Sequence, residues 1–514
     1  MQGKKDYQEQ LFTSFQLSNH VPKVNFYRRL WEVLDLKFLY KLTKPYYGDC
    51  GQKSLDPVVF YKLCLVGYLE NIISDRRLIE HSSMRMDILF FLGYDIDEPL
   101  PWHSTISRTR QLFPEDLFEE VFTKVLSMCV EKGMVSGHTQ VIDSAPVKAN
   151  ASMDSLELKV PEEKLAEHIH KIRNSEDNNE PRRKSKGDKS DEDQRKLMAS
   201  DSELNDIKNR NKNWREASTD RPGRNNKKSK YTSNKTHYSP TDPDARISVK
   251  PGKPRKLNYL SQMSVDAAHH VITDISAELA DKKDSQYLQE ITLRLGKRLQ
   301  AQGLLMYNVL ADAGYSSGDN YAFFEEQNLK SYIPPHGKYK GGPTGLMFNK
   351  EENYWECSQG KHAKFRKIHF ENGLKKRQYA TVRKDCRDCP IKTACIGKSH
   401  EKRFNITYYK DEYDRAIARL STSQGKRFKF LRSSTVEPVF GSLTQFFGMR
   451  KVNTIGIKQA NKVMHMAAAA YNLKKYLKFT AKKAISKAEE VKTPLLLFLR
   501  LIIGQKNFSE TLTF

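Results

Sequence analysis

The first part of the chain has the hydrophobic pattern of helices. Across residues 24–133, apolar residues recur at spacings of three and four, and Pro or Gly interrupts them at intervals. Pro57 opens one predicted helix, residues 104–105 open another, and Pro114 begins a long amphipathic helix. The pattern therefore predicts an all-α region over residues 1–135.

After residue 137 the spacing of the apolar residues changes from the helical period to the two-residue period of strands. Residues 138–143 have strand character, and Pro146 is expected to interrupt the strand, because proline lacks the N–H that a central strand donates. Residues 259–266 and 271–279 alternate between polar and apolar positions on either side of a short turn. This alternation predicts a hairpin.

A helix and a second core strand are expected after the hairpin. Asp284 can cap a helix whose apolar stripe ends at Gly303. Residues 304–311 are nearly all apolar, as in a strand buried on both faces, and they end at Asp312. The order of these elements predicts an α/β fold: a mixed sheet flanked by helices, with an all-α N-terminal domain and a β-rich insertion.

Composition suggests where this order is interrupted. Residues 171–230 contain 18 Lys or Arg and 12 Asp or Glu, so half of this segment is charged and it is expected to be a flexible insertion. The predicted divisions are a helical DNA-binding domain (1–135), a first catalytic strand (136–150), the charged insertion (151–255), a catalytic core (256–330), the β-rich insertion with a Cys cluster (331–425), catalytic C-terminal helices (426–480) and a tail (481–514).

The net charge of the chain indicates which kind of partner it binds. The formal charge is +25 and the isoelectric point is near 9.5, which favours a polyanion, with nucleic acid ahead of an anionic membrane. No apolar run approaches the length of a spanning helix, and we expect no secretion signal. Seven cysteines are too few for a disulfide scaffold, so a reducing compartment is expected.

Three carboxylates stand out by their position. Asp143 and Asp312 each lie where a predicted core strand meets a loop, and Glu437 lies in a predicted amphipathic helix. Acidic side chains at such places are costly unless something binds them, and a pair of Mg²⁺ ions would be sufficient. A single aspartate of this kind is usually a turn residue or a helix cap, but two of them followed by a glutamate favour a metal site.

These three segments, in this order, resemble the DDE transposases of bacterial insertion sequences. The resemblance also includes the helical segments 74–78 and 103–107, residues 241–246 and the tail 472–475. It implies that Asp143, Asp312 and Glu437 hold two Mg²⁺ or Mn²⁺ ions on a ribonuclease-H-like sheet. It further implies hydrolysis that frees a 3′-OH at each element end, followed by attack of that hydroxyl on target DNA.

The same resemblance implies the partners and the compartment. The DNA would be double-stranded and would carry the terminal inverted repeats of the element or the target site. A homodimer would pair the two element ends on DNA, and the protein would work in the cytoplasm at the bacterial nucleoid. Two rival functions remain: a metal-dependent nuclease without strand transfer, and a non-catalytic DNA-binding protein derived from a transposase.

Basic side chains near these segments are candidate DNA contacts. Arginines at helix starts in the N-terminal region suit the binding of DNA phosphates. An ordinary helical domain with a solvated basic face has the same pattern. Many relatives carry Tyr, Arg and Lys in fixed register around the glutamate, where this chain has Phe430, Ser433 and Thr444. The candidate contacts are Arg76, Arg77, Arg108, Arg110, Lys148, Arg432, Arg450 and Lys451.

Two further expectations concern the environment of Glu437. Because of Pro438, the helix is expected either to begin near Thr435, with Glu437 in its first turn, or to kink there. The aromatic residues around it recur near helical spacing and are predicted to lie in the core rather than to form a base-stacking platform. They are Phe430, Phe440, Phe446 and Phe447.

The cysteines divide into two groups. Cys386, Cys389 and Cys395 follow one another at zinc-site spacing, and Cys357 upstream is the natural fourth thiolate of a structural Zn²⁺ site. The alternative is four reduced thiols in a β-rich insertion. The remaining cysteines lie in apolar helical runs and are predicted to pack in the core; they are Cys50, Cys64 and Cys129.

Overall fold

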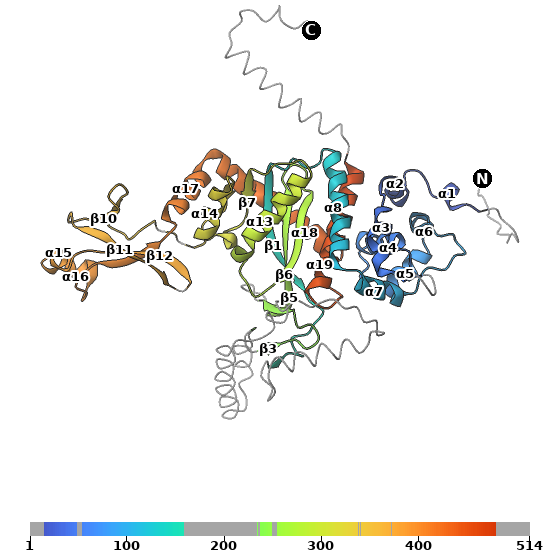
Figure 1. Cartoon of the computed structure of the whole chain (residues 1–514), viewed down its shortest axis with the longest axis horizontal. Coiled ribbons are helices and arrows are strands. Elements are labelled where there is room, and N and C mark those ends of the chain that lie inside the picture. Colours follow the sequence, from blue (N-terminus) through green and yellow to red (C-terminus); the bar gives the residue numbers. More distant parts are fainter. Residues whose placement is uncertain are drawn as a thin grey trace, which may run out of the picture. The chain divides into compact units, whose positions relative to one another are not determined.

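The computed structural model describes residues 15–48, 54–158, 234, 237–248, 254–337, 339, 341–371 and 373–479. The chain forms two units: residues 1–136 together with 466–514, and residues 137–465 (Figure 1). The charged segment 171–230, the tail 481–514 and Cys50 lie outside the described residues. None of the helices described combines the length and hydrophobicity that a bilayer-spanning segment needs.

The first unit is built from short helices around an aromatic core. Asp56 caps α4 by accepting hydrogen bonds from the backbone of Val58 and Val59, and Pro57 occupies the first turn. Phe60 and Phe113 pack edge to face inside the unit. The helices are α1 (Leu17–His20), α2 (Phe26–Val33), α3 (Phe38–Thr43), η1 (Lys44–Tyr46), α4 (Pro57–Leu69), α5 (Asp75–Ser83), α6 (Met86–Leu92), α7 (His103–Leu112) and α8 (Glu115–Glu131), which confirms the all-α prediction.

A mixed sheet forms the centre of the second unit. Its strand order is β4-β5-β1-β7-β8, and β6 also pairs with β5. The pairs β1–β5 and β5–β6 are antiparallel, whereas β1–β7 and β7–β8 are parallel. This is the expected ribonuclease-H-like arrangement. The strands are β1 (Thr139–Lys148), β4 (Arg246–Ser248), β5 (Lys256–Asp266), β6 (Ile272–Leu279), β7 (Asn308–Leu310) and β8 (Lys330–Tyr332); a separate pair is β2 (Glu157–Leu158) with β3 (His237–Tyr238).

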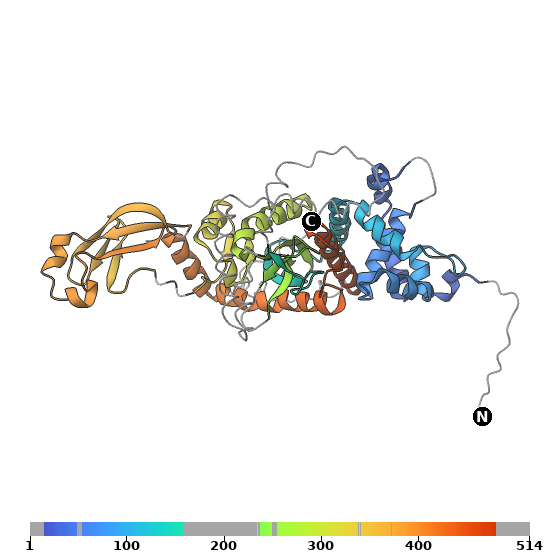
Figure 2. The same cartoon turned by 90° about the horizontal axis from the view of Figure 1, so that it is seen from below.

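Helices cover both faces of this sheet (Figure 2). On one side, α13 (Asp284–Ala301) packs against β6 and α14 (Gly318–Glu326) packs against β8. On the other side, α18 (Ser423–Phe446) lies against β1, β5, β7 and β8. The helix α19 (Ile457–Lys478) begins in the second unit, and its residues from 466 onward belong to the first.

Pro146 does not interrupt the first strand, contrary to the prediction. β1 continues through Pro146 to Lys148 and pairs with β5 along this length. On its other edge, β1 pairs with β7 only over residues 139–141. The open edge beside Pro146 explains why its missing N–H is tolerated.

Two other elements differ from the predictions. β7 covers only Asn308–Leu310 rather than the whole of 304–311, and Leu305 is more than half exposed. α18 begins at Ser423, where Thr422 caps it by accepting from the backbone of Gly425. Glu437 therefore lies in the middle of a long helix that contains Pro438. Of the two alternatives, a helix start near Thr435 was wrong.

The predicted β-rich insertion is present as a second antiparallel sheet. Its strand order is β13-β12-β11-β10-β9, and it has its own core of Trp355, Ala363, Tyr379 and Ile406. The helix α17 (Lys410–Ser421) leads from this sheet to α18. The other elements are β9 (Leu346–Asn349), β10 (Tyr354–Cys357), β11 (His362–Glu371), β12 (Leu374–Ala380), α15 (Arg383–Arg387), α16 (Lys392–Ile396), β13 (Arg403–Thr407) and the 3₁₀ turn η2 (Ala313–Tyr315).

Candidate active site

The sheet register places Asp143 and Asp312 at the same level. Val141 of β1 pairs in parallel with Leu310 of β7. Asp143 and Asp312 each follow two residues after this last pair, Asp143 still within β1 and Asp312 just beyond the end of β7. Asp312 then turns the chain, because its carboxylate accepts a hydrogen bond of 2.8 Å from the backbone of Gly314.

The third acidic residue comes from α18 together with an arginine. Arg432 Nη1 donates to Asp143 Oδ2 at 2.9 Å, and Arg432 Nη2 lies 3.6 Å from Glu437 Oε1. The Glu437 side chain is 63% exposed, whereas that of Asp143 is 15% exposed. Arg432, one residue out of the family register, thus links the acid on the helix to the acid on the sheet.

The electrostatics of Asp143 are unfavourable for its charged form. Burial raises the pKa of Asp143 to about 6; the backbone N–H of Ser144 lowers it, Asp312 raises it, Arg432 lowers it and Asp284 raises it. The Ser144 N–H donates to Asp143 Oδ1 at 2.8 Å. Arg432 therefore does not fully offset burial and the neighbouring carboxylates, so this edge of the sheet favours additional positive charge.

A fourth carboxylate, which we did not identify from the sequence, lies at the same edge. Lys283 is the N-cap of α13, and Asp284 accepts a 3.0 Å hydrogen bond from Gln262 Nε2 on β5. A Cβ at Gly314 would lie 3.0 Å from Asp312 Oδ1 and 3.4 Å from Asp284 Oδ2, so both acids flank one glycine. The only sequence signal was an aspartate at a helix start, which is usually read as a cap.

The donor set suits a hard divalent cation. Asp143, Asp312, Glu437 and Asp284 offer carboxylate oxygens, which Mg²⁺ and Mn²⁺ prefer. A cationic group, the guanidinium of Arg432, already lies between two of them. Among the described residues, no three His, Cys, Asp or Glu side chains are gathered tightly enough to hold a metal. The residues therefore fit the cations by chemistry and charge, without forming a closed ligand set.

The candidate DNA contacts of the first unit differ in their availability. Arg76, Arg77 and Arg108 are exposed. Arg110 instead forms a bidentate ion pair with Asp75, through hydrogen bonds of 2.7 and 2.8 Å, which ties α7 to α5. Its guanidinium is already engaged in holding the helices together.

The candidates of the second unit form a small group at the end of β1. Lys148 is exposed and makes a parallel bridge to Lys451, and the backbone of Val452 donates to the Lys148 carbonyl. Arg450 is exposed beside them. Lys148 lies on the strand that carries Asp143, and Lys451 is bridged to its end.

The aromatic prediction for α18 was wrong for two of its four residues. Phe430 is 76% exposed and Phe446 is 58% exposed, whereas Phe447 is buried and Phe440 partly buried. Helical spacing located the aromatic residues but did not reveal which face the sheet covers.

Zinc binding by the four cysteines of the insertion remains a prediction. Cys357 ends β10, Cys386 lies in α15, Cys395 lies in α16, and Cys389 lies between these two helices. All four are free thiols of intermediate burial, and the described residues show no metal-binding group among them. The core assignment of Cys64 and Cys129 is confirmed, because both are buried.

Two family models match the chain. Residues 15–112 match the model described as "Transposase domain (DUF772)", and residues 356–477 match the model described as "Transposase DDE domain". Glu437 and Arg432 lie inside the second match, whereas Asp143 and Asp312 lie outside both. No curated protein matches the chain.

Several solved structures of a transposase share limited similarity with the chain. The Mos1 transposase paired-end complex with left transposon end is 12% identical over 61% of this chain and 73% of that one, with a TM-score of 0.16. The Mos1 strand transfer complex is 12% identical over 61% and 72%, with a TM-score of 0.16. The Mos1 mariner paired end complex with Mn is 10% identical over 63% and 76%, with a TM-score of 0.15. Such TM-scores do not establish a shared arrangement.

Proposed function

We propose that this chain, which matches a transposase domain model and a transposase DDE domain model, cuts DNA at element ends through Asp143, Asp312 and Glu437 and then joins the freed ends to target DNA. The observation that supports this assignment best is the position of Asp143 on β1 and of Asp312 just after the neighbouring β7, each two residues beyond a paired position, with Glu437 linked to Asp143 through Arg432. A carboxylate edge of this kind is suited to divalent cations.

The chain's own residues have distinct roles in this proposal. Asp143 and Asp312 hold the cations from the sheet, and Glu437 holds them from α18. When bound, a pair of Mg²⁺ or Mn²⁺ ions activates the attacking water or hydroxyl and stabilises the leaving oxygen. Arg432, which is paired with Asp143 and Glu437 in this structure, would bind a phosphate oxygen beside the scissile bond once those acids hold cations.

The partner in this proposal is double-stranded DNA. The net charge of +25 and the exposed arginines of α5 and α7 suit phosphate contacts. Terminal inverted repeats supply the specific sites, and a homodimer pairs two ends at the bacterial nucleoid. Lys148, Arg450 and Lys451 extend the positive surface next to β1.

The test is cleavage of an element-end duplex with Mg²⁺ or Mn²⁺ by the full chain. Asp143→Ala, Asp312→Ala and Glu437→Ala should each lower cleavage by about 10³-fold or more while leaving duplex binding nearly unchanged. Glu290→Ala, at an exposed acid of α13, is the matched control and should cut normally.

The products separate the rival functions. Transfer of the freed 3′ end into target DNA supports the transposase reaction. Cleavage without joining would support the metal-dependent nuclease instead. Metal-independent binding with no cleavage by the unaltered chain would support the non-catalytic DNA-binding protein.

A further inference from the structure

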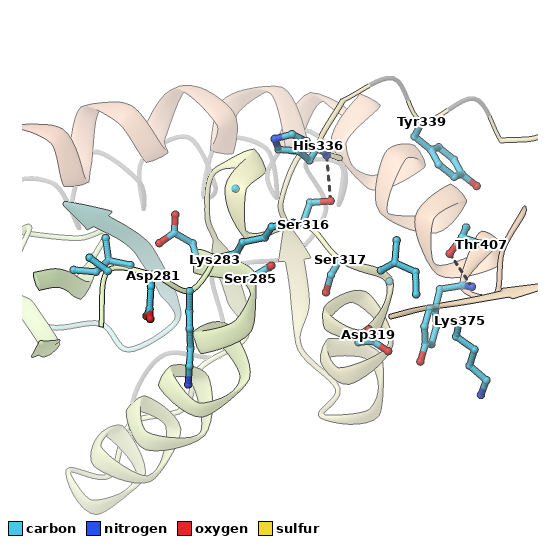
Figure 3. Close-up of a pocket in the computed structure, with 18 of the residues that line it drawn as sticks. Asp281, Lys283, Ser285, Ser316, Ser317, Asp319, His336, Tyr339, Lys375 and Thr407 are labelled. Atoms are coloured by element: carbon cyan, nitrogen blue, oxygen red, sulfur yellow. Dashed lines mark hydrogen bonds between the residues drawn. The ribbon is translucent and has the colours of Figure 1, made fainter. Parts of the chain in front are cut away.

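A cavity of about 860 Å³ adjoins the carboxylate edge of the second unit (Figure 3). Asp284 and Gly314 belong to its lining, and the Gly314 position lies next to Asp312. Its opposite wall comes from the insertion sheet and the residues just after it, through residues 374–376, Thr407 and Tyr409. The cavity therefore runs from the catalytic edge to the base of the insertion.

Lysines on both walls give this cavity positive charge. Lys282 and Lys283 come from the start of α13, and Lys375 and Lys376 come from β12. Lys376 pairs with Glu371 at 3.0 Å. Within the described residues, neither Lys283 nor Lys375 forms an ion pair, and Lys375 Nζ lies 3.8 Å from the ring centre of Tyr408. Two cations on facing walls are thus available to an anionic ligand.

The acids of the lining are already engaged. Asp281 lies 3.4 Å from the guanidinium of Arg246, and Asp319 is hydrogen-bonded to Tyr409. Asp284 accepts from Gln262. Gln262 and Tyr409 are neutral, so Asp284 and Asp319 keep their negative charges, and Lys282, Lys283 and Lys375 leave a small excess of positive charge on the walls. This excess suits a phosphate backbone.

The loop between the two lysine pairs is polar and closely packed. Ser317 caps α14 by accepting from the backbone of Asn320, and Ser316 accepts from the backbone of His336 at 3.2 Å. A Cβ at Gly318 would overlap the ring of Tyr409, so this loop is fixed against the end of the insertion sheet. Figure 3 shows Ser316 and Ser317 between Lys283 and Lys375.

The size of the cavity favours a single DNA strand over a duplex. Its volume is in the range of sites that enclose small molecules, about 300–1,000 Å³. Such a space holds a nucleotide or two of a single strand, whereas a duplex has a major groove that is itself about 12 Å wide.

We infer that this cavity binds the phosphates of an unpaired DNA strand that leads away from the scissile bond, with Lys283 and Lys375 as its main cationic contacts. The inference rests on the proposed function, since it gives the path of the same DNA substrate. It adds a strand-binding site that is distinct from the duplex contacts of the first unit.

The test uses the full chain in EDTA and two probes, an oligothymidylate of about 12 nucleotides and a blunt duplex of random sequence. Fluorescence anisotropy should show that the double variant Lys283→Ala, Lys375→Ala binds the single strand about tenfold more weakly. The slope of log K against log salt should become shallower by about 1.4, for two lost phosphate contacts. Duplex binding should change by less than about twofold.

Two further variants serve as controls. Lys297→Ala, at an exposed lysine of α13 outside the cavity lining, should bind both probes normally. The double variant Lys283→Arg, Lys375→Arg should retain strand binding because it retains both charges. If the arginine pair retains strand binding and the alanine pair has an unchanged circular-dichroism melt, the loss of strand binding by the alanine pair is due to lost charge and not to misfolding.

Two results would overturn the inference. One is unchanged strand binding by the alanine pair; the other is an equal loss for the strand and the duplex, which would assign the cavity to duplex DNA. Neither result affects the catalytic assignment, because metal-dependent cleavage by the unaltered chain and its loss in Asp143→Ala are measured separately.

Discussion

At the scale of single residues, the environment of Asp143 favours ion binding over stability. Its carboxylate is buried beside Asp312 and within the field of Asp284, and only Arg432 and one backbone N–H oppose this cost. A raised pKa means that the folded chain holds a proton that the unfolded chain would release. The residue therefore costs stability whenever it is charged without a cation.

This cost predicts a stabilising substitution. The pKa of Asp143 is about 6 in the folded chain, against 3.8 for an ordinary aspartate. Below about pH 4 this carboxyl is largely protonated in both the folded and the unfolded chain, so the stability cost vanishes. The cost grows between pH 4 and pH 6 and is complete above about pH 6. Asp143→Asn should raise the free energy of unfolding near pH 7.5 by up to about 3 kcal/mol, and by almost nothing near pH 4.

Thermal unfolding in EDTA at these two pH values measures the effect. Asp97→Asn, at an exposed aspartate, is the control and should change neither melt. Adding Mn²⁺ should raise the melting temperature of the unaltered chain but much less that of Asp143→Asn. A variant that is less stable than the unaltered chain at neutral pH would contradict this account of Asp143.

At the scale of elements, α13 connects the carboxylate edge with β6. Its first residue, Asp284, points to the carboxylate edge, whereas its middle anchors β6 through a buried ion pair. Arg294 Nη2 lies 2.7 Å from Asp274 Oδ2, and Arg298 Nη2 lies 3.3 Å from Oδ1. Burial opposes the charge of Asp274, but the two arginines outweigh it and hold its pKa below the usual value.

Breaking this pair should weaken the second unit strongly. Asp274→Asn would remove a fully buried carboxylate and leave the charges of Arg294 and Arg298 without it, so we expect a loss of roughly 3–5 kcal/mol. Arg415→Ala is the control, because Arg415 is half exposed in its ion pair with Glu325 and should cost at most about 1 kcal/mol. Urea unfolding of both variants tests the difference; equal losses would refute a structural role specific to Asp274.

Elements also show how far the sequence could predict this molecule. Periodicity located β5, β6, α13 and the acids Asp143 and Asp312, because these patterns are local. The continuation of β1 through Pro146 depends on which edge is open, and that is decided by distant pairing with β7. The approach of Arg432 and Asp284 to the acids likewise depends on packing between segments far apart in the chain, which no local pattern contains.

At the scale of the whole molecule, the two family matches fall on different parts of the chain. The transposase-domain match lies in the first unit, and the DDE-domain match lies mostly in the second and continues along α19 into the first. The exposed arginines Arg76, Arg77 and Arg108 lie in the first unit, away from the three acids in the sequence. If they supply most of the duplex contacts, duplex affinity should survive the loss of an acid.

The last prediction concerns this affinity and the charge of +25. If duplex binding rests on phosphate contacts, log K should fall linearly with log salt, and 6–10 contacts would lower affinity by about 10³–10⁵ between 50 and 200 mM salt. Asp312→Ala should show the same slope, because removing a catalytic acid deletes no phosphate contact. The double variant Arg76→Ala, Arg77→Ala should instead lose about two contacts and show a shallower slope.

Anisotropy titrations of one labelled duplex across a salt series measure the slopes of the unaltered chain and of both variants. Affinity that is insensitive to salt would show that the positive charge of this chain serves a purpose other than holding DNA.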